Sequence, residues 1–367
     1  MAEPIRVLHV VTYMGRGGLE SMLMNYYRNI DRTKVQFDFL VHRQERHEYE
    51  DEIESLGGRI YRVSRLKPWS SHYRREVLEF FRSHPEYKIV HCHVDCMSAI
   101  PLQAAKKAGV PVRIAHSHSS NQHVDLKYLL KLYYKKQIPS AATDLFSCGE
   151  IAGKWMFGNH PFRILPNAID AKAFSYNPQV RERMRREMGW KDELIIGHVG
   201  NFSEVKNHPF ILDVLKELLD MGKNVKLFSV GEGYMFDSVL SKARKLQLED
   251  AIFFAGNRGD VADCLQAMDV FILPSLHEGL PVTTIEAQAA GLPCLISDKV
   301  PIECKKTDLV KQIPLDRGPR FWAEEILKAR GTPRRNTAAE IADSGFDICG
   351  TAVKLQNFYT ELYQTRG

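Results

Sequence analysis

Residues 269–297 read DVFILPSLHEGLPVTTIEAQAAGLPCLIS, and they carry the clearest pattern of strands and helix in the chain. The apolar run Val270–Leu273 predicts a buried parallel strand, because strands covered on both faces lack alternating polar residues. Pro281 predicts the start of a helix, since proline is tolerated in a first helical turn. Cys294–Ser297 predicts the next strand. Strand, loop, helix and strand in this order indicate an α/β fold with a parallel sheet.

Two carboxylates in this stretch are candidates for ligand binding. Glu278 lies in the loop, and Glu286 follows after seven intervening residues, about one turn inside the helix. We expect free N–H groups at Val282–Thr284 and the helix dipole to favour a phosphate group. Glu286 can accept hydrogen bonds from vicinal hydroxyls such as those of a ribose, and Glu278 from those of a sugar. The spacing alone fits two solvated surface carboxylates equally well.

The alternation of strand and helix continues outward in both directions. Strand-like runs in the first half are Ile5–Val11, Val35–Val41, Arg59–Val63, Lys88–His93, Val112–Ala115, Asp144–Ser147 and Phe162–Leu165. Those of the second half, before the stretch above, are Leu194–Val199, Val225–Val230 and Ile252–Ala255. Helical stretches separate most of them. Repeated units of this kind predict parallel sheets with helices on both faces.

The alternation pauses where residues 166–178 read PNAIDAKAFSYNP. A length of 367 residues suggests two domains or three. We therefore expect two doubly wound, Rossmann-like domains, residues 1–170 and 171–345. Such domains bind ligands at the carboxyl ends of their strands, so two of them facing each other would hold a ligand in the cleft between.

Two further strand-to-helix junctions carry candidate groups. Residues 197–208 read GHVGNFSEVKNH, which places Lys206 before a helix, where its charge can bind a phosphate. An exposed lysine without a ligand fits the same pattern. Residues 15–20 read GRGGLE. This loop lacks the G-x-G-x-x-G spacing of a dinucleotide site, which disfavours a nicotinamide dehydrogenase, and a plain tight turn explains it as well.

Composition excludes several classes of protein. Hydrophobic residues make up 44% and charged residues 26%, which is typical of a globular chain with a sizeable core. No run of about 18 apolar residues predicts a membrane-spanning helix, and the N-terminus lacks the pattern of a secretory signal. Seven cysteines, an odd number, do not suggest a disulfide framework, so we expect a reducing cytoplasm. The net charge of +5 permits an anionic ligand or membrane surface without requiring either.

Taken together, the motifs resemble the retaining GT-B glycosyltransferases of family 4, also called glycosyl transferases group 1, and most closely their capsular and exopolysaccharide branch. They stand in the family's order over nearly the whole chain: GRGGLE (15–20), AHSH (115–118), ILPNAID (164–170), VGNFSEVKNH (199–208), FAGNRGDV (254–261) and the pair Glu278 and Glu286. The pair in its full context is specific, whereas each other motif alone is weak. The resemblance implies the GT-B fold, with a C-terminal helix over 346–367 that crosses back to the first domain.

The resemblance also implies roles for individual residues. Glu286 would bind the ribose of a nucleotide-sugar donor, and Glu278, with Gly279 beside it, the donor sugar. Lys206 would neutralise the leaving diphosphate. The remaining donor contacts would be the backbone amides of Val282 and Thr283, the segment 257–261 around the base, and the glycines of the N-terminal loop, Gly17 and Gly18.

On the acceptor side, the resemblance implies that His118 lies near the transferred sugar, as a polar contact more than as a base. Gly17 would also approach the acceptor, and His116 is the less favoured histidine of its pair. Lys206, Glu278 and His118 would form the catalytic group. Packing in a loop at the end of a strand is the alternative for His118.

Two positions depart from the family pattern. Asn201 stands where the family usually carries an arginine that binds phosphate, and an arginine fork binds phosphate better than an amide does. Arg16 and Arg258 are candidate substitutes, of which Arg258 lies in the expected donor site. Ala168 stands where the family usually has glycine. We expect the second departure to alter a turn in the linker without deciding activity.

Histidine and cysteine gather at 91–96 (HCHVDC), with His116 and His118 further on. The spacing fits no standard zinc site. On a strand, His91 and His93 face one side and Cys92 the other, where it is expected to be a small core side chain. We expect no bound metal and no cofactor, since helix dipole and lysine would replace a cation at the diphosphate.

Residues 127–136 read KYLLKLYYKK and predict a helix with Lys127, Lys131 and Lys135 on one face. A basic aromatic helix can lie on an anionic bilayer, which would suit a lipid-linked acceptor at the inner membrane face. The alternative is a surface helix that packs Leu130, Tyr134 and Ile138 into the domain. No motif supports nucleic-acid binding.

We therefore expect a cytoplasmic, retaining, metal-independent glycosyltransferase of the hexosyltransferase type. Its donor would be a nucleotide-sugar, a UDP-sugar before a GDP-sugar, and its acceptor a saccharide or lipid-linked saccharide in cell-surface polysaccharide assembly. A sugar-nucleotide epimerase of the same fold is one alternative, which the glutamate pair together with Lys206 disfavours. A non-catalytic sugar-nucleotide binding protein is the other, motivated by Asn201.

Overall fold

The computed structural model describes residues 3–118 and 128–367. The chain divides into two compact units, of which the first comprises Met1–Ala168 with Ile348–Gly367 and the second comprises Ile169–Asp347. The boundaries predicted from the sequence lie after residues 170 and 345. No helix in the described part of the chain is both long enough and apolar enough to cross a bilayer.

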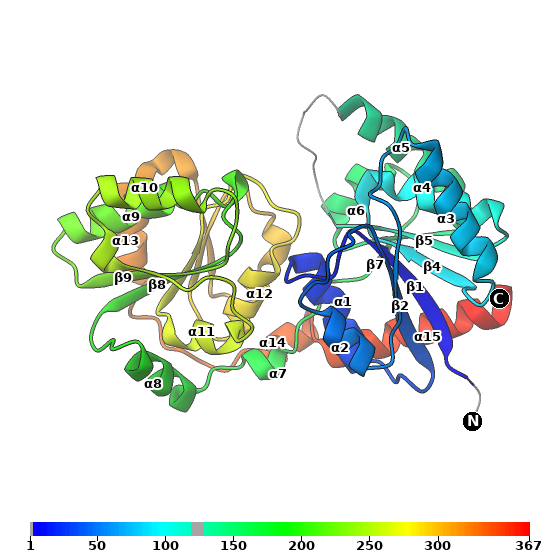
Figure 1. The fold of residues 1–367 in the computed structure, drawn as a ribbon. Coiled ribbons are helices and arrows are strands. Elements are labelled where there is room, and N and C mark those ends of the chain that lie inside the picture. The colour runs from blue at the N-terminus through cyan, green and yellow to red at the C-terminus, as the bar shows by residue number, and fades with distance from the viewer. Residues whose placement is uncertain (1–2, 119–127) are drawn as a thin grey trace. The chain divides into compact units, whose positions relative to one another are not determined.

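The first unit is built on a seven-stranded parallel sheet in the order β3-β2-β1-β4-β5-β6-β7 (Figure 1). Its strands are β1 (Ile5–Val11), β2 (Val35–Val41), β3 (Ile60–Arg62), β4 (Ile89–Cys92), β5 (Val112–Ser117), β6 (Asp144–Ser147) and β7 (Arg163–Ile164). Every residue of β2 is buried, as its unbroken apolar run predicts.

Helices cover both faces of this sheet. The helices on one face are α1 (Gly18–Asn29), α2 (Glu50–Ser55) and α15 (Ile348–Arg366). Those on the other face are α3 (Ser71–Ser83), α4 (Ala99–Lys107), α5 (Tyr128–Ala141) and α6 (Glu150–Phe157). The C-terminal helix α15 thus belongs to the first unit. It buries Tyr359 against β1 and β2, and the Gln356 amide oxygen accepts a 2.7 Å hydrogen bond from the Asp31 N–H.

The second unit has a six-stranded parallel sheet in the order β10-β9-β8-β11-β12-β13. Its strands are β8 (Leu194–Val199), β9 (Val225–Val230), β10 (Ile252–Phe254), β11 (Val270–Leu273), β12 (Cys294–Ser297) and β13 (Val310–Ile313). Strand β13 was not predicted from the sequence, because Lys311 and Gln312 interrupt the apolar pattern of its four residues VKQI.

Helices α9 (His208–Asp220), α10 (Phe236–Lys245) and α13 (Gly318–Ala329) build one buried core with this sheet. The remaining helices of the unit are α7 (Ala171–Phe174), α8 (Pro178–Glu187), α11 (Val261–Ala267), α12 (Val282–Ala289) and α14 (Ala338–Asp343). Asn177 caps α8 through its side-chain oxygen, and Pro178 follows in the first turn, where its missing N–H costs nothing.

Both sheets have the strand order of doubly wound folds, in which the chain first builds outward to one side and then returns to build on the other. The order reverses between β1 and β4 in the first sheet and between β8 and β11 in the second. In open parallel sheets, ligands bind beyond the carboxyl ends of the strands at such a switch point. We therefore expect ligand-binding residues in the loops that follow β1, β4, β8 and β11.

Candidate functional site

The strands β8 and β11 bring two predicted residues together at the switch point of the second unit. Lys206 follows β8 in a short 3-10 turn, and Glu278 lies in the loop after β11. Lys206 Nζ lies 2.6 Å from Glu278 Oε1, and the two side chains are only 15% and 11% exposed. These two residues were predicted to have separate roles, whereas in the structure they form an ion pair.

Backbone and side-chain hydrogen bonds fix the two loops against each other. The Leu276 N–H donates to the Val205 carbonyl at 2.8 Å, and the Asn207 amide donates to the Pro274 carbonyl at 3.1 Å. Asn207 has a left-handed backbone with φ of 55°, a conformation that asparagine tolerates better than most residues. The Ser275 hydroxyl donates to Glu278 Oε1 at 2.7 Å. Glu278 is therefore held in place from two sides.

The N-terminus of α12 lies in the same loop region. The helix begins at Val282, with Pro281 in the capping position. Three free N–H groups were expected here, but the Thr284 N–H donates to the Pro281 carbonyl at 3.1 Å, so only those of Val282 and Thr283 remain. Thr283 Oγ1 is buried and has no partner among the residues described. Two backbone donors and a hydroxyl at the positive end of a helix dipole favour an anion.

Glu286 lies one turn inside α12. Its side chain is half-buried, and no hydrogen bond or ion pair reaches it from the described parts of the chain. Burial raises the pKa of its carboxyl to about 7. A partly buried carboxyl without a partner is costly, and hydroxyl donors from a ligand would relieve that cost.

Arg258 and Arg16, the two residues expected to replace the phosphate-binding arginine of the family, have different environments. The Arg258 guanidinium is bound by the Asp260 carboxylate, with Nε 2.7 Å from Oδ1, so part of its charge is already neutralised. Arg16 is exposed. Asn201 is exposed at the end of β8, where its side-chain oxygen accepts a 3.2 Å hydrogen bond from the Ser203 hydroxyl.

Close backbone approach keeps the loop after β8 beside the loop after β9. Gly231 has φ of 135°, and a side chain there would place its Cβ 2.1 Å from the Gly200 carbonyl oxygen. Only glycine fits this position. The same region brings the Asn257 N–H to Glu232 Oε1 at 3.3 Å, so the segment predicted to surround the base lies beside these loops. Glu232 was not identified from the sequence.

In the first unit, the glycine loop leads directly into α1. Gly17 is the capping residue, and a Cβ at this position would lie 2.2 Å from Glu20 Oε2, whereas a Cβ at Gly18 would meet no atom within 4 Å. Glu20 is buried, and that burial raises its pKa to about 7. The sequence predicted no role for Glu20, although it belongs to the motif GRGGLE.

The two predicted histidines of this unit lie at the end of β5. His118 Nε2 lies 2.9 Å from His93 Nδ1, and burial lowers its pKa to about 3, so the ring is neutral. His116 is 2% exposed, and its ring lies beside His91 and Phe146. Within the first unit His116 is therefore a core residue, because an acceptor cannot reach a ring that its neighbours cover.

The predicted membrane helix packs into its own unit. Tyr134 and Ile138 are buried, and the Arg74 guanidinium donates to the Tyr134 hydroxyl at 2.7 Å. Lys135 Nζ lies 4.2 Å from the centre of the Trp155 ring. Leu129 and Tyr133, one turn apart, are 79% and 60% exposed. Lys127, the first lysine of the predicted basic face, lies outside the described residues.

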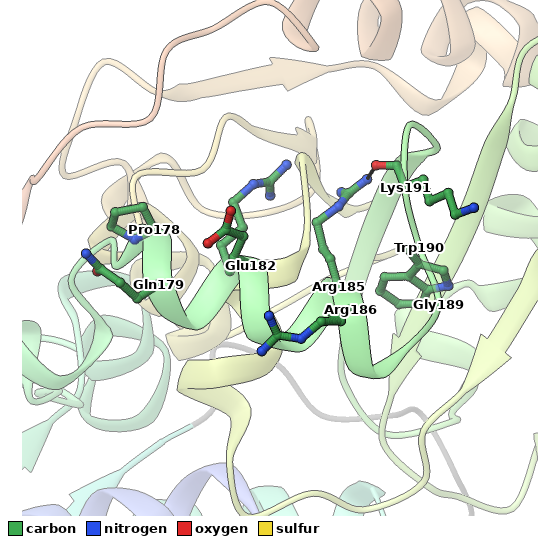
Figure 2. Close-up of a pocket in the computed structure, with 9 residues that line it drawn as sticks. Pro178, Gln179, Glu182, Arg185, Arg186, Gly189, Trp190 and Lys191 are labelled. Carbon is green, nitrogen blue, oxygen red and sulfur yellow. Dashed lines mark hydrogen bonds between the residues drawn. The ribbon is translucent and has the colours of Figure 1, made fainter.

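The structure also has a hollow along α8 (Figure 2), lined by Pro178, Gln179, Arg181, Glu182, Arg185, Arg186, Gly189, Trp190 and Lys191. None of the predicted site residues lines it. Arg181 and Arg185 both bind the Asp269 carboxylate, which begins the segment leading into β11. These arginines therefore hold α8 to the sheet.

Comparison with known proteins identifies the class. The structure of Anabaena HepE in complex with UDP and glucose superposes with a TM-score of 0.81 over 97% of this chain and 99% of that chain, at 16% sequence identity. Two doubly wound units of this kind define the GT-B glycosyltransferase fold.

Sequence comparison identifies the family of glycosyltransferases within this fold class. A family model described as glycosyl transferases group 1 matches residues 180–305. EpsF of Bacillus subtilis (strain 168), which is named as a glycosyltransferase, is 38% identical over 98% of this chain and 98% of its own. The Escherichia coli UDP-Gal:alpha-D-GlcNAc-diphosphoundecaprenol alpha-1,3-galactosyltransferase is 28% identical over 58% of each chain. The chain belongs to the group 1 glycosyltransferases, and it is an enzyme of that type.

Proposed function

We propose that the protein transfers a hexose from a UDP-sugar to a saccharide carried on a lipid diphosphate, with retention of anomeric configuration, in cell-surface polysaccharide assembly. The observation that carries the donor site is the Lys206–Glu278 ion pair beside the open N-terminus of α12. The E. coli relative supports the choice of donor and acceptor, because its name specifies UDP-Gal and a diphosphoundecaprenol-linked sugar.

In this proposal, the main task of the site is to stabilise the negative charge of the leaving UDP. The N–H groups of Val282 and Thr283 would bind the diphosphate, and Lys206 would neutralise it as the glycosidic bond breaks. No divalent cation is required at the phosphates, because lysine and helix dipole supply the positive potential.

Glu278 and Glu286 would act as hydrogen-bond acceptors for donor hydroxyls. They are therefore assigned no acid–base role of the kind that paired carboxylates have in glycosidases. Glu286 would bind the ribose, and Glu278, with Gly279 beside it, the hexose. Arg258, Asn201 and the glycines 17 and 18 complete the proposed donor contacts, and His118 would contact the sugar or acceptor as a neutral ring.

We place the reaction in the cytoplasm at the inner membrane face. The odd number of seven cysteines supports a reducing compartment. The exposed side chains Leu129 and Tyr133 on α5 supply an apolar surface suited to a bilayer that holds the acceptor.

The first test is calorimetry with UDP, GDP and ADP, with and without EDTA, on the full chain and on the variant Glu286→Ala. Selective, EDTA-insensitive binding of UDP that is lost in the variant is expected. Equal affinity in the variant, or no binding of any nucleotide, would contradict the donor site.

Transfer is then tested with radiolabelled UDP-hexoses and short synthetic lipid diphosphate saccharides, and NMR of the product gives the anomeric configuration. A new glycosidic bond with the donor's configuration is expected. Epimerised free UDP-sugar would instead indicate an epimerase. Tight binding without turnover on any acceptor would indicate a non-catalytic binding protein.

A further inference from the structure

Strand register places a set of histidines on one face of the first sheet, at its switch point. His9 on β1 lies directly opposite His91 on β4, and His93 lies two residues further along on the same side. Strand β5 adds a further histidine to the same face, because Ile114 on β5 lies opposite His91 and His116 is two residues further along. Four imidazole rings thus occupy one face over three neighbouring strands.

Three of these rings converge. One ring nitrogen from each of His9, His91 and His93 lies within 4.8 Å of the other two. His9 Nδ1 and His93 Nε2 are 3.0 Å apart. The three side chains are 1%, 0% and 4% exposed. Two ligand nitrogens at 2.0–2.1 Å from a tetrahedral ion lie about 3.3 Å apart, which is close to the observed separation of His9 Nδ1 and His93 Nε2.

Two of the three nitrogens that point away from the triad have partners, whereas the third, His9 Nε2, is buried and has none among the described residues. His91 Nδ1 lies 2.6 Å from the Tyr359 hydroxyl, and His93 Nδ1 lies 2.9 Å from His118 Nε2. His91 Nε2 has no partner among the described residues and is buried. His91 and His93 thus have the arrangement of metal-bound histidines, with one nitrogen free for the ion and the other able to donate its N–H outward.

We propose that His9 Nδ1, His91 Nε2 and His93 Nε2 bind one first-row divalent transition-metal ion, with zinc the best match. Imidazole is a preferred ligand for zinc, whereas magnesium and calcium require oxygen ligands. Three histidines leave a fourth position for water, as in other three-histidine zinc sites. An ion also satisfies the buried His91 nitrogen, which otherwise carries a desolvation cost.

The ion would fix the tautomer of a residue in the proposed acceptor site. With Nε2 bound to the metal, His93 carries its proton on Nδ1 and donates it to His118 Nε2. His118 must then carry its own proton on Nδ1. His9, His91 and Tyr359 are positioning residues in this arrangement, and the ion lies in the first unit, whereas the proposed diphosphate contacts of α12 lie in the second.

The sequence predicted no metal here, because the spacing of the histidines and cysteines in residues 91–96 fits no standard zinc site. The missing ligand was His9, which is 82 residues before His91 and joins it only through strand pairing. Cys92 is not a ligand, since it points to the opposite face and is buried in that core. A second group of histidines, His93, His116 and His118, lies next to the triad. Both groups contain His93, and one ring nitrogen of His93 can bind only one ion, so the two groups are alternative ligand sets.

The test is metal analysis of the full chain, purified without a polyhistidine tag. Mass spectrometry of the protein is expected to find about one zinc per chain after expression with zinc supplied. Chelator-treated protein refilled with Co²⁺ should give the visible absorption of tetrahedral cobalt, and its thermal unfolding midpoint should rise on zinc addition. Wild-type protein that binds neither ion would overturn the proposal.

Matched variants locate the ion. His91→Gln and His9→Asn should each lose the metal and the cobalt spectrum, with circular dichroism checking the fold. The control is His42→Gln, because His42 is also buried in this unit but its ring nitrogens contact the Val11 carbonyl and the Tyr73 hydroxyl. The control should keep one ion per chain. Metal that persists in both triad variants but is lost in His116→Gln would overturn the assignment in favour of the second group.

Discussion

Lys206 Nζ and Glu278 Oε1 lie 2.6 Å apart, although 72 positions separate the two residues in the chain. The ion pair joins the loops after β8 and β11, where the strand order reverses. In the proposed reaction Lys206 must turn its charge toward the leaving diphosphate. The pair therefore holds the lysine in the site before the donor binds.

Lys206→Ala is expected to lower kcat by about 10²- to 10³-fold while changing the donor KM much less, because the lysine would act mainly on charge that develops in the transition state. Initial rates over a range of UDP-sugar concentrations measure both constants. Lys206→Arg keeps the charge and is the control. A rate for the alanine variant equal to that of the wild type removes the proposed role.

Lys206→Ala is also expected to lower the thermal unfolding midpoint, because the nearly buried Glu278 carboxylate then loses the cation beside it. Adding Glu278→Gln should recover part of that loss, because the neutral amide costs less to bury. Differential scanning calorimetry of the two single variants and the double variant gives the coupling. Strictly additive effects would show that the two side chains do not interact.

UDP affinity is expected to fall by about tenfold between pH 8 and pH 6 through Glu286, whose pKa burial raises to about 7. The ionised carboxylate is the stronger acceptor for ribose hydroxyls, and the fraction ionised decreases as the pH falls through the pKa. Calorimetry at each pH is compared with Glu286→Gln, which also corrects for titration of UDP itself. Parallel pH profiles in the two proteins would contradict the assignment.

Gly231→Ala is expected to destabilise the protein by about 3 kcal/mol or more and to weaken UDP binding, because its Cβ would lie 2.1 Å from the Gly200 carbonyl oxygen at φ of 135°. Gly222→Ala is the control. Gly222 has φ of 70° with no atom within 4 Å of an added Cβ, so the cost there should be about 1–2 kcal/mol. Urea unfolding measures both. Equal losses in the two variants would show that the close approach is unimportant.

Leu129→Ser combined with Tyr133→Ser is expected to reduce cosedimentation with anionic phospholipid vesicles several-fold, since both side chains are exposed on α5. Val353→Ser with Tyr363→Ser removes exposed apolar side chains from α15 and should leave vesicle binding unchanged. Transfer to a water-soluble acceptor should be equal in all three proteins. Wild-type protein that stays in the supernatant refutes the membrane role.

Much of the fold follows directly from the sequence. Unbroken apolar runs such as Val35–Val41 and Leu194–Val199 predict buried parallel strands, and both are fully buried. The strand β13 was missed because Lys311 and Gln312 interrupt its apolar pattern. The fold class is confirmed by the structural comparison.

The site was predictable only as separate motifs. Spacing within one motif places Glu278 and Glu286 on a loop and the following helix, but it contains no information about Lys206, which comes from another strand. The histidine face needed the register of β1 against β4, which sequence periodicity does not give. Contacts between distant motifs depend on strand order, and strand order has to be read from the structure.

The helix α15 makes the first unit discontinuous along the chain, since Ile348–Gly367 completes a core begun by residues 1–168. During synthesis, every residue of the contiguous second unit, Ile169–Asp347, is added before Leu355 and Tyr359 are made. The first unit therefore cannot complete its core before the second unit has been synthesised, which departs from the usual order in which the N-terminal domain folds first. Until α15 is present, the first unit has an uncovered apolar face, so a chain that stops after Asp347 would contain every residue of the second unit but would lack part of the core of the first.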